Sequence, residues 1–461
     1  MNNIVYSVNE KPPFSKVILS AFQQLLAVLA ATIAVPAIIG NGMSQSAALF
    51  GAGVGTLVYL AFTRFKSPVF LGSSFAFLGS MGAAFAGAAS VAMGYIGLII
   101  GALLAGLVYV ILSVVVKFCG TAWIDKMMPP VVIGPTVAII GLTLAPNAIS
   151  DLQQGNVTEM IDEVAVSVAN PILCIAIGII TLIVVVCFSI FGKKTIKMIP
   201  FILGILVGYA VASIFTLIGM GTGVKELQII NFSSFQDIQW IPDFAFIKSF
   251  EGFKGFENAG HFFKYFGVIA LAYIPVAFVV FAEHIADHKN LSSIIDSNLL
   301  EEPGLHRTLL GDGVGSFAGA LFGGCPNTTY GESIACVAIS GNASTMVTLV
   351  TAIMAIVVSF FGPFVTFLAT IPKCVMGGVC MSLYGFIAVS GLKMLKGVDL
   401  SNNKNVFVIS VILIAGVGGL VLNFLGISIT EVAVALILGI IINLLVNIKK
   451  EKPQEVEQKE E

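Results

Sequence analysis

The residues with the clearest capacity for chemistry lie at 323–332, where the sequence reads Gly-Gly-Cys-Pro-Asn-Thr-Thr-Tyr-Gly-Glu. The stretch is too polar and too broken for a spanning helix, because Pro326 lacks a backbone donor and two glycines precede it. Thr-Thr-Tyr predicts a short extended segment, and Glu332 opens the next apolar run. Non-helical backbone at membrane depth needs protein or a wet cavity around it. We therefore interpret this stretch as part of a ligand site.

Two carboxylates, Glu283 and Glu332, fall inside or at the edge of apolar runs. A charge at the centre of a spanning helix costs about 2.5–3.5 kcal/mol on insertion scales, so both acids indicate a function. Asp287 is four residues after Glu283 and shares its face on a continuous helix. Asp287 and its neighbour His288 are either polar residues at the edge of the membrane or part of the same site.

A second interrupted apolar run, at 68–77, contains Gly72-Ser73-Ser74-Phe75. Phe75 is placed to lie flat against a planar ligand, while backbone amides and the Ser74 hydroxyl reach the edge of that ligand. Tyr330 either contributes in the same way or packs with its hydroxyl satisfied. These groups suit a neutral, planar, hydrogen-bonding solute better than an anion. A carboxylate that gains and loses a proton could couple its movement to a proton gradient, so the residues alone predict a cation-coupled carrier.

The other polar residues predict no further chemistry. Asp312 and Glu431 lie near the ends of their apolar runs, and we expect them to be solvated. The seven cysteines lack metal-type spacing and are interpreted as reduced packing residues. The four histidines form no ligand set, and no nucleophile–base pair is present. We therefore expect no metal, no cofactor and no enzyme activity.

The elements that position these residues must be membrane helices. The chain has 461 residues, of which 57% are hydrophobic and 10% are charged, whereas a soluble protein carries about 25% charged residues. No basic patch points to nucleic acid. About fourteen apolar windows are expected, near 16–40, 44–63, 69–86, 91–116, 129–149, 170–191, 197–219, 263–284, 307–323, 326–341, 344–370, 373–392, 404–424 and 427–448.

The distribution of charge predicts the topology. Most of the 23 lysines and arginines fall on loops that share a side with the N-terminus, while 150–170 carries acids but no lysine or arginine. This pattern places both termini in the cytoplasm. Seven spans in each half then require an inverted repeat, with the interrupted span third in each half. The expected parts are a cytoplasmic N-terminus (1–15), a first repeat (16–219), an extracellular loop (220–262), a second repeat (263–448) and a disordered cytoplasmic tail (449–461).

Four motifs resemble the bacterial uracil permeases, which belong to the nucleobase–ascorbate transporter (nucleobase–cation symporter-2) family. They are Leu-Gly-Ser-Ser-Phe-Ala-Phe at 71–77, Ala-Glu-His-Ile at 282–285, Pro-Gly-Leu-His-Arg at 303–307 and Pro-Asn-Thr-Thr-Tyr-Gly-Glu at 326–332. They occur in family order and at family spacing, and the resemblance runs from about Lys11 to Lys449.

The resemblance implies an all-α polytopic membrane protein of fourteen segments in two inverted repeats. Spans 1–4 and 8–11 would form a core domain, spans 5–7 and 12–14 a gate domain, and short antiparallel strands would cross in spans 3 and 10. It also implies uracil:proton symport into the cell by an elevator-type movement of the core. The protein would be a homodimer formed through the gate domains, in the plasma membrane.

The resemblance also assigns roles to residues. Glu283 and Glu332 would bind the pyrimidine, Phe75 would pack on its ring, and backbone groups at Tyr330 and Gly331 would complete the site. Proton coupling would involve Glu283 with Asp287 or His288, since Asp287 stands where the uracil permease pattern has histidine.

Three further positions depart from the family pattern. They are Gln24, where histidine is familiar, Ser333, where asparagine is usual, and Ala335, where glycine is usual. The substrate range could therefore be altered, and a carrier of xanthine, guanine or another purine is the first alternative. An anion exchanger of the related sulfate-transporter architecture is the second, and the two glutamates argue against it because they would repel an anion.

Overall fold

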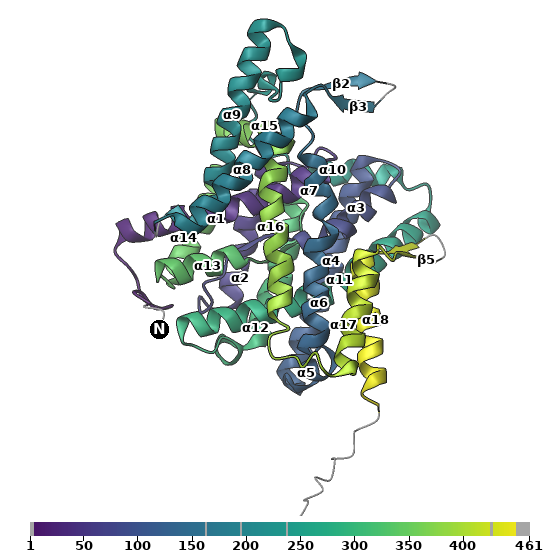
Figure 1. Ribbon diagram of the computed structural model, residues 1–461. Coiled ribbons are helices and arrows are strands. Elements are labelled where there is room, and N and C mark those ends of the chain that lie inside the picture. The colour runs from purple at the N-terminus through teal and green to yellow at the C-terminus, as the bar shows by residue number, and fades with distance from the viewer. Residues whose placement is uncertain (1–3, 162–163, 194–195, 237, 425–426, 449–461) are drawn as a thin grey trace, which may run out of the picture.

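The computed structural model describes residues 4–161, 164–193, 196–236, 238–424 and 427–448 (Figure 1). The expected tail at 449–461 lies outside the described residues. The α-helices are α1 (Phe14–Ile39), α2 (Gln45–Phe62), α3 (Leu78–Ala86), α4 (Val91–Cys119), α5 (Ala122–Met127), α6 (Pro130–Thr143), α7 (Ala145–Asp151), α8 (Pro171–Phe191), α9 (Pro200–Thr222), α10 (Ala245–Gly252), α11 (Ala259–Ile295), α12 (Leu305–Gly323), α13 (Gly331–Ser340), α14 (Thr345–Val358), α15 (Gly362–Thr370), α16 (Lys373–Lys393), α17 (Asn403–Val417) and α18 (Glu431–Val446).

Eight helices in the described part of the chain are long and apolar enough to cross a membrane. They match eight of the predicted windows, and the chain is a multi-pass membrane protein. The window at 344–370 is not one straight helix, because α14 and α15 meet at a bend of 85°. The window at 263–284 ends too early: α11 continues to Ile295, so Glu283, Asp287 and His288 all lie on one uninterrupted helix.

Two short strands, far apart in the chain, each interrupt an apolar run. They are β1 (Leu71–Ser73) and β4 (Asn327–Thr329), which pair antiparallel with Gly72 opposite Thr328. Each strand leads into a short helix, α3 or α13. Because strand and helix together replace a full spanning helix, backbone amides and carbonyls become available in the interior of the molecule.

The long helices pack in two sets. The first set contains α1, α2, α4, α11, α12 and α14, and four of these helices, α1, α2, α11 and α12, contact the strand pair. The second contains α6, α8, α9, α16, α17 and α18. Glycines allow the closest crossings in both sets: a Cβ at Gly51 would lie 2.3 Å from the Gly319 carbonyl oxygen, and one at Gly378 would lie 2.2 Å from that of Gly178. Small residues at such crossings are typical of membrane helix packing.

Two connections join the sets at the top of Figure 1, near the hairpin of β2 (Thr158–Ile161) and β3 (Val164–Ser167). One is α15. The other is the predicted loop at 220–262, which contains α10 docked on α4 and α12. Lys248 fixes α10, because its Nζ lies 2.5 Å from the Gly42 carbonyl oxygen and 2.5 Å from the Asp243 carboxylate. The strands β5 (Leu422–Phe424) and β6 (Ile427–Ile429) form a second antiparallel pair of neighbouring strands, between α17 and α18.

Candidate functional site

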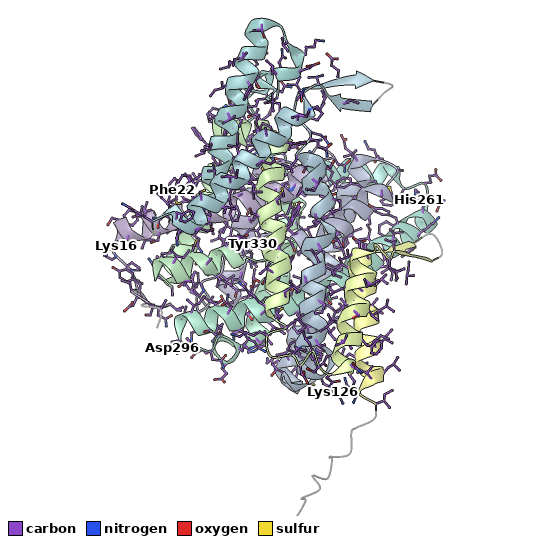
Figure 2. All side chains as sticks on the ribbon, viewed as in Figure 1. Lys16, Phe22, Lys126, His261, Asp296 and Tyr330 are labelled. Carbon is purple, nitrogen blue, oxygen red and sulfur yellow. The ribbon has the colours of Figure 1, made fainter. Side chains whose placement is uncertain are left out.

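A cavity of about 460 Å³ lies between the two helix sets. The strand pair and α11 form its polar wall, while α6, α9 and α16 form an apolar wall that includes Val137, Phe201 and Leu383. Tyr330, which lines the cavity, lies near the middle of the molecule (Figure 2). Two exposed lysines, Lys197 and Lys393, also belong to its lining. The volume falls within the usual range of small-molecule sites.

The strand pair is held rigidly behind the cavity. The Tyr330 hydroxyl donates to the Ser73 carbonyl at 2.8 Å, and its ring lies so close to Gly72 that a Cβ there would be 2.3 Å away. The backbone N–H of Ser74 donates to the Pro326 carbonyl at 2.9 Å, whereas the buried Ser74 Oγ has no partner among the described residues. Ser74 therefore presents an unsatisfied hydroxyl at the cavity wall, and such a group usually indicates a missing ligand or water.

Phe75 offers the cavity an aromatic ring in a fixed position. It begins the short 3₁₀ turn after β1 and is buried. Its ring meets that of Tyr384 edge to face, with centroids 5.8 Å apart and an interplanar angle of 79°. Because Tyr384 supports one edge, the face of Phe75 can serve as a stacking surface for a planar solute.

One face of α11 carries the acids of the cavity. Glu283, Asp287 and Asn290 line it at intervals of four and three residues, which is the spacing of one helix face. Asp287 Oδ2 accepts a hydrogen bond of 2.6 Å from the Thr329 hydroxyl, so this acid also ties α11 to β4. Glu332, in the first turn of α13, faces the same cavity.

A buried network next to Glu332 joins four elements. Gln24 of α1 donates from Nε2 to the Ser333 hydroxyl at 2.8 Å, and its Oε1 accepts from Thr351 of α14 at 2.9 Å. Ser333 also accepts from the backbone N–H of Phe70 at 3.1 Å, immediately before β1. The network therefore sets where α13 begins relative to β1, and with it the position of Glu332.

Comparisons with known proteins now identify the chain. Residues 15–425 match the sequence model of a protein family described as the Permease family. The uracil permease of Bacillus subtilis (strain 168) is 36% identical over 445 residues, covering 95% of this chain and 94% of the relative. The uracil permease of Escherichia coli (strain K12) is 33% identical, covering 99% and 97%. The chain belongs to the permease family.

Solved structures show that the permease shares its fold with anion transporters. The transmembrane domain of the cyanobacterium bicarbonate transporter BicA aligns with a TM-score of 0.61 and 15% identity, covering 96% of this chain and all of that one. The structure of SLC26A9 aligns with a TM-score of 0.63 and 12% identity, covering 93% of this chain and 64% of that one. At such identities the likeness concerns the fold alone.

The structure brings most of the predicted site residues together in this permease. The cavity is lined by Ser74, Phe75, Glu283, Asp287, Tyr330, Gly331 and Glu332. His288 is placed elsewhere: it is fully buried on the other face of α11, where Nδ1 donates to the His284 carbonyl at 2.8 Å and Nε2 lies 2.7 Å from the Tyr59 hydroxyl.

The expectation for Asp312 was wrong. It is not solvated but 1% exposed, and its Oδ2 lies 2.7 Å from Nδ1 of the equally buried His284. The sequence gives no warning of this contact, because it depends on how α11 crosses α12. Glu431, by contrast, keeps partial exposure to the surroundings in the first turn of α18, near the end of a span.

Several site residues carried little signal in the sequence. Thr329 and Asn290 are ordinary polar residues until the fold places them beside the acids of the cavity. Gln24 and Ser333 stood out as departures from the family pattern, yet nothing in the sequence indicated that they contact each other. Residues 309 positions apart become partners only through the packing of α1 on α13.

Proposed function

We propose that this permease carries uracil into a bacterial cell by proton symport. The observation that supports the proposal best is the cavity that gathers an aromatic face, two glutamates and the backbone after β4, in a chain that is one-third identical to uracil permeases along nearly its whole length. Enzyme activity has no comparable support, since the matching family is described as a permease family.

The chemistry of uracil fits the groups available. Uracil is planar and neutral, with two N–H donors and two carbonyl acceptors on its edge. The carboxylates of Glu283 and Glu332 can accept from the N–H groups, and the backbone N–H of Gly331 can donate to a carbonyl, whereas that of Tyr330 already donates to the Phe70 carbonyl. The face of Phe75 offers a stacking surface for the ring. A pocket with an apolar body and a few polar groups of this kind gives orientation and specificity.

Proton coupling would use the carboxylates on α11. Glu283 would take up the proton that accompanies uracil, because the neutral acid can both donate and accept a hydrogen bond in the loaded site. Asp287 would take the place of the histidine familiar in uracil permeases. The hydrogen bond that it accepts from Thr329 would couple its protonation state to the position of β4. His288 is a weaker candidate, since it lies outside the cavity lining.

The transport movement would be an elevator motion of the first helix set, as the core domain, against the second, as the gate domain. The position of the cavity between the sets supports this assignment, because sliding one wall past the other would carry the site across the membrane. The helices α8 and α9 are the least buried of the long apolar helices, which supports a homodimer formed through the gate domain in a lipid bilayer. Both termini would lie in the cytoplasm of a plasma-membrane protein.

The decisive experiment is uptake of radiolabelled uracil into proteoliposomes, with and without an inward proton gradient, and with unlabelled xanthine as competitor. Accumulation driven by the gradient and insensitive to xanthine is expected. Strong competition by xanthine would favour the purine alternative. Chloride- or bicarbonate-driven exchange without uracil uptake would favour an anion exchanger, since the solved structures of this fold include a bicarbonate transporter and an anion transporter.

Matched variants separate the roles of the acids. Glu283→Gln should abolish gradient-driven uptake, while Glu332→Ala should weaken uracil binding. Glu431→Gln is the control, because it removes an acid outside the cavity and should leave uptake unchanged. Near-normal uptake in both cavity variants would refute the assignment of the site.

A further inference from the structure

A second polar centre lies behind the strand pair, separate from the substrate cavity. Asp312 of α12 is buried, and only one of its oxygens is engaged, by His284. Asp312 Oδ1 has no partner within the described structure, and neither has the buried hydroxyl of Tyr109 on α4. Two buried oxygens without partners in one region need an explanation, because each costs about 1–3 kcal/mol when unsatisfied.

These two groups line a common small cavity, which we call the rear cavity. It is also lined by Ser316 of α12 and by Asn327 and Thr328 of β4. Its volume is about 10 Å³, which is room for one water-sized particle. Five oxygen-bearing side chains thus surround a space that fits a single small ion.

The charge balance favours a cation over water. The Thr308 hydroxyl lies 3.0 Å from both Nε2 of His284 and the Leu305 carbonyl. When it donates to Nε2 and Nδ1 donates to Asp312, the imidazole is neutral and the Asp312 carboxylate keeps its negative charge. No lysine or arginine in the described part of the chain is buried to balance the carboxylate. A proton on the imidazole would balance this charge, but it would leave Asp312 Oδ1 and Tyr109 without partners. A cation in the rear cavity satisfies both.

The ligand types select the ion. Carboxylate, hydroxyl and amide oxygens are the ligands of hard cations, and a single carboxylate balances a single charge. Broken spans of transporters provide such oxygens near their unwound backbone. We propose that the rear cavity binds one Na⁺ ion, held by Asp312 Oδ1 and the Tyr109 hydroxyl, with further oxygens from Ser316, Asn327 and Thr328.

The position of the ion suggests what it does. Thr328 lines both the rear cavity and the substrate cavity, so β4 is the partition between them. An ion on one side of the strand would brace the backbone that faces the solute on the other. This consequence rests on the proposed uracil transport, whereas the ion site itself does not.

The test therefore uses a readout that needs no solute. Thermal unfolding of the purified permease in detergent is followed while NaCl replaces KCl at constant ionic strength and pH. A saturable rise in melting temperature that is specific to Na⁺ is expected, because an ion that binds only the folded state stabilises it. Asp312→Asn should abolish the response, and Tyr109→Phe should weaken the apparent Na⁺ affinity about ten-fold through the loss of one ligand.

Two controls locate the ion. Glu332→Gln alters the substrate cavity and should keep the Na⁺ response, whereas its loss there would place the ion with the substrate. If Asp312→Asn does not fold, Ser316→Ala and direct ²²Na⁺ binding to the unaltered permease replace it. No Na⁺-specific stabilisation and no ²²Na⁺ binding would mean that water fills the cavity, and would overturn the proposal.

A response to pH in place of Na⁺ would also overturn it. It would assign the charge balance to a proton on Asp312 itself or on the titratable groups around it. These are His284 and His288 of α11, Tyr59 of α2 and Tyr109 of α4, with Glu283 and Asp287 on the other face of α11. Uracil uptake measured with and without Na⁺ tests the link to transport separately. If Na⁺ stabilises the permease but does not change uptake, the ion site is supported and only its role in transport is refuted.

Discussion

The hydrogen bond between Gln24 and Ser333 predicts that substitutions at these two positions affect stability non-additively. The residues are far apart in the sequence, and neither lines the substrate cavity. Gln24→Ala removes two buried hydrogen bonds, one to the Ser333 hydroxyl at 2.8 Å and one from Thr351 at 2.9 Å. Each is worth about 0.5–1.5 kcal/mol net. The truncation also enlarges a small cavity of about 10 Å³ that Gln24 lines, which brings the expected loss of unfolding free energy to about 2–4 kcal/mol.

The same change should affect transport more than its distance from the cavity suggests. Ser333 follows Glu332 directly and also accepts a hydrogen bond from the backbone N–H of Phe70. Loss of the Gln24 side chain therefore allows both α13 and β1 to shift. A loss of about 1.4 kcal/mol in the positioning of Glu332 corresponds to a ten-fold rise in the Michaelis constant for uracil. The maximal rate should fall less, because the parts that move remain intact.

A double-mutant cycle tests this reasoning. Unfolding free energies of Gln24→Ala, Ser333→Ala and the double variant are measured by reversible SDS-induced unfolding in mixed micelles, alongside uptake kinetics. The double variant should be about 1 kcal/mol more stable than the sum of the single losses, since both single changes break the same bond. Gln23→Ala, at the half-buried neighbouring residue, is the control. Additivity within about 0.3–0.5 kcal/mol would refute the network.

Three further changes probe the parts that hold the site. Gly72→Ala should reduce uracil uptake more than ten-fold in a folded protein, because its Cβ would lie 2.3 Å from the Tyr330 ring and overpacking costs about 1–3 kcal/mol; normal uptake would show that the ring is free to move. Thr329→Val should lower the apparent uracil affinity about ten-fold by removing the bond to Asp287, and Thr329→Ser should restore it. Lys248→Met should speed amide hydrogen exchange across 245–255, since this side chain fixes α10; unchanged protection there would show that apolar packing alone docks the helix.

Much of the fold could be predicted from the sequence because the hydrocarbon of a membrane offers no hydrogen bonds to the backbone. Long apolar runs must be helical to satisfy their own backbone, which is why eight predicted spans return as helices in the described part of the chain. The breaks at 71–73 and 327–329 could also be predicted, since glycine, proline and polar residues interrupt the apolar runs there. Glu283 and Glu332 stood out because an acid in an apolar run is costly without a use.

What the sequence could not determine is which residues meet. Asp312 looked like a solvated residue near the end of a span, and only the crossing of α11 with α12 buries it against His284. His288 is one residue from Asp287, yet the rotation of about 100° per residue in a helix turns it away from the cavity and toward Tyr59.

The limits of prediction have one physical reason. Apolar patterning and backbone breaks are local properties that a sequence carries directly. They determined the membrane class, the eight spans that return as helices in the described part of the chain, and the two breaks that form the strand pair. The partners of buried polar groups depend on helix crossings between segments far apart in the chain, such as α1 on α13 or α4 on α12. The network of Gln24 and the rear cavity of Asp312 and Tyr109 were therefore decided by the tertiary structure alone.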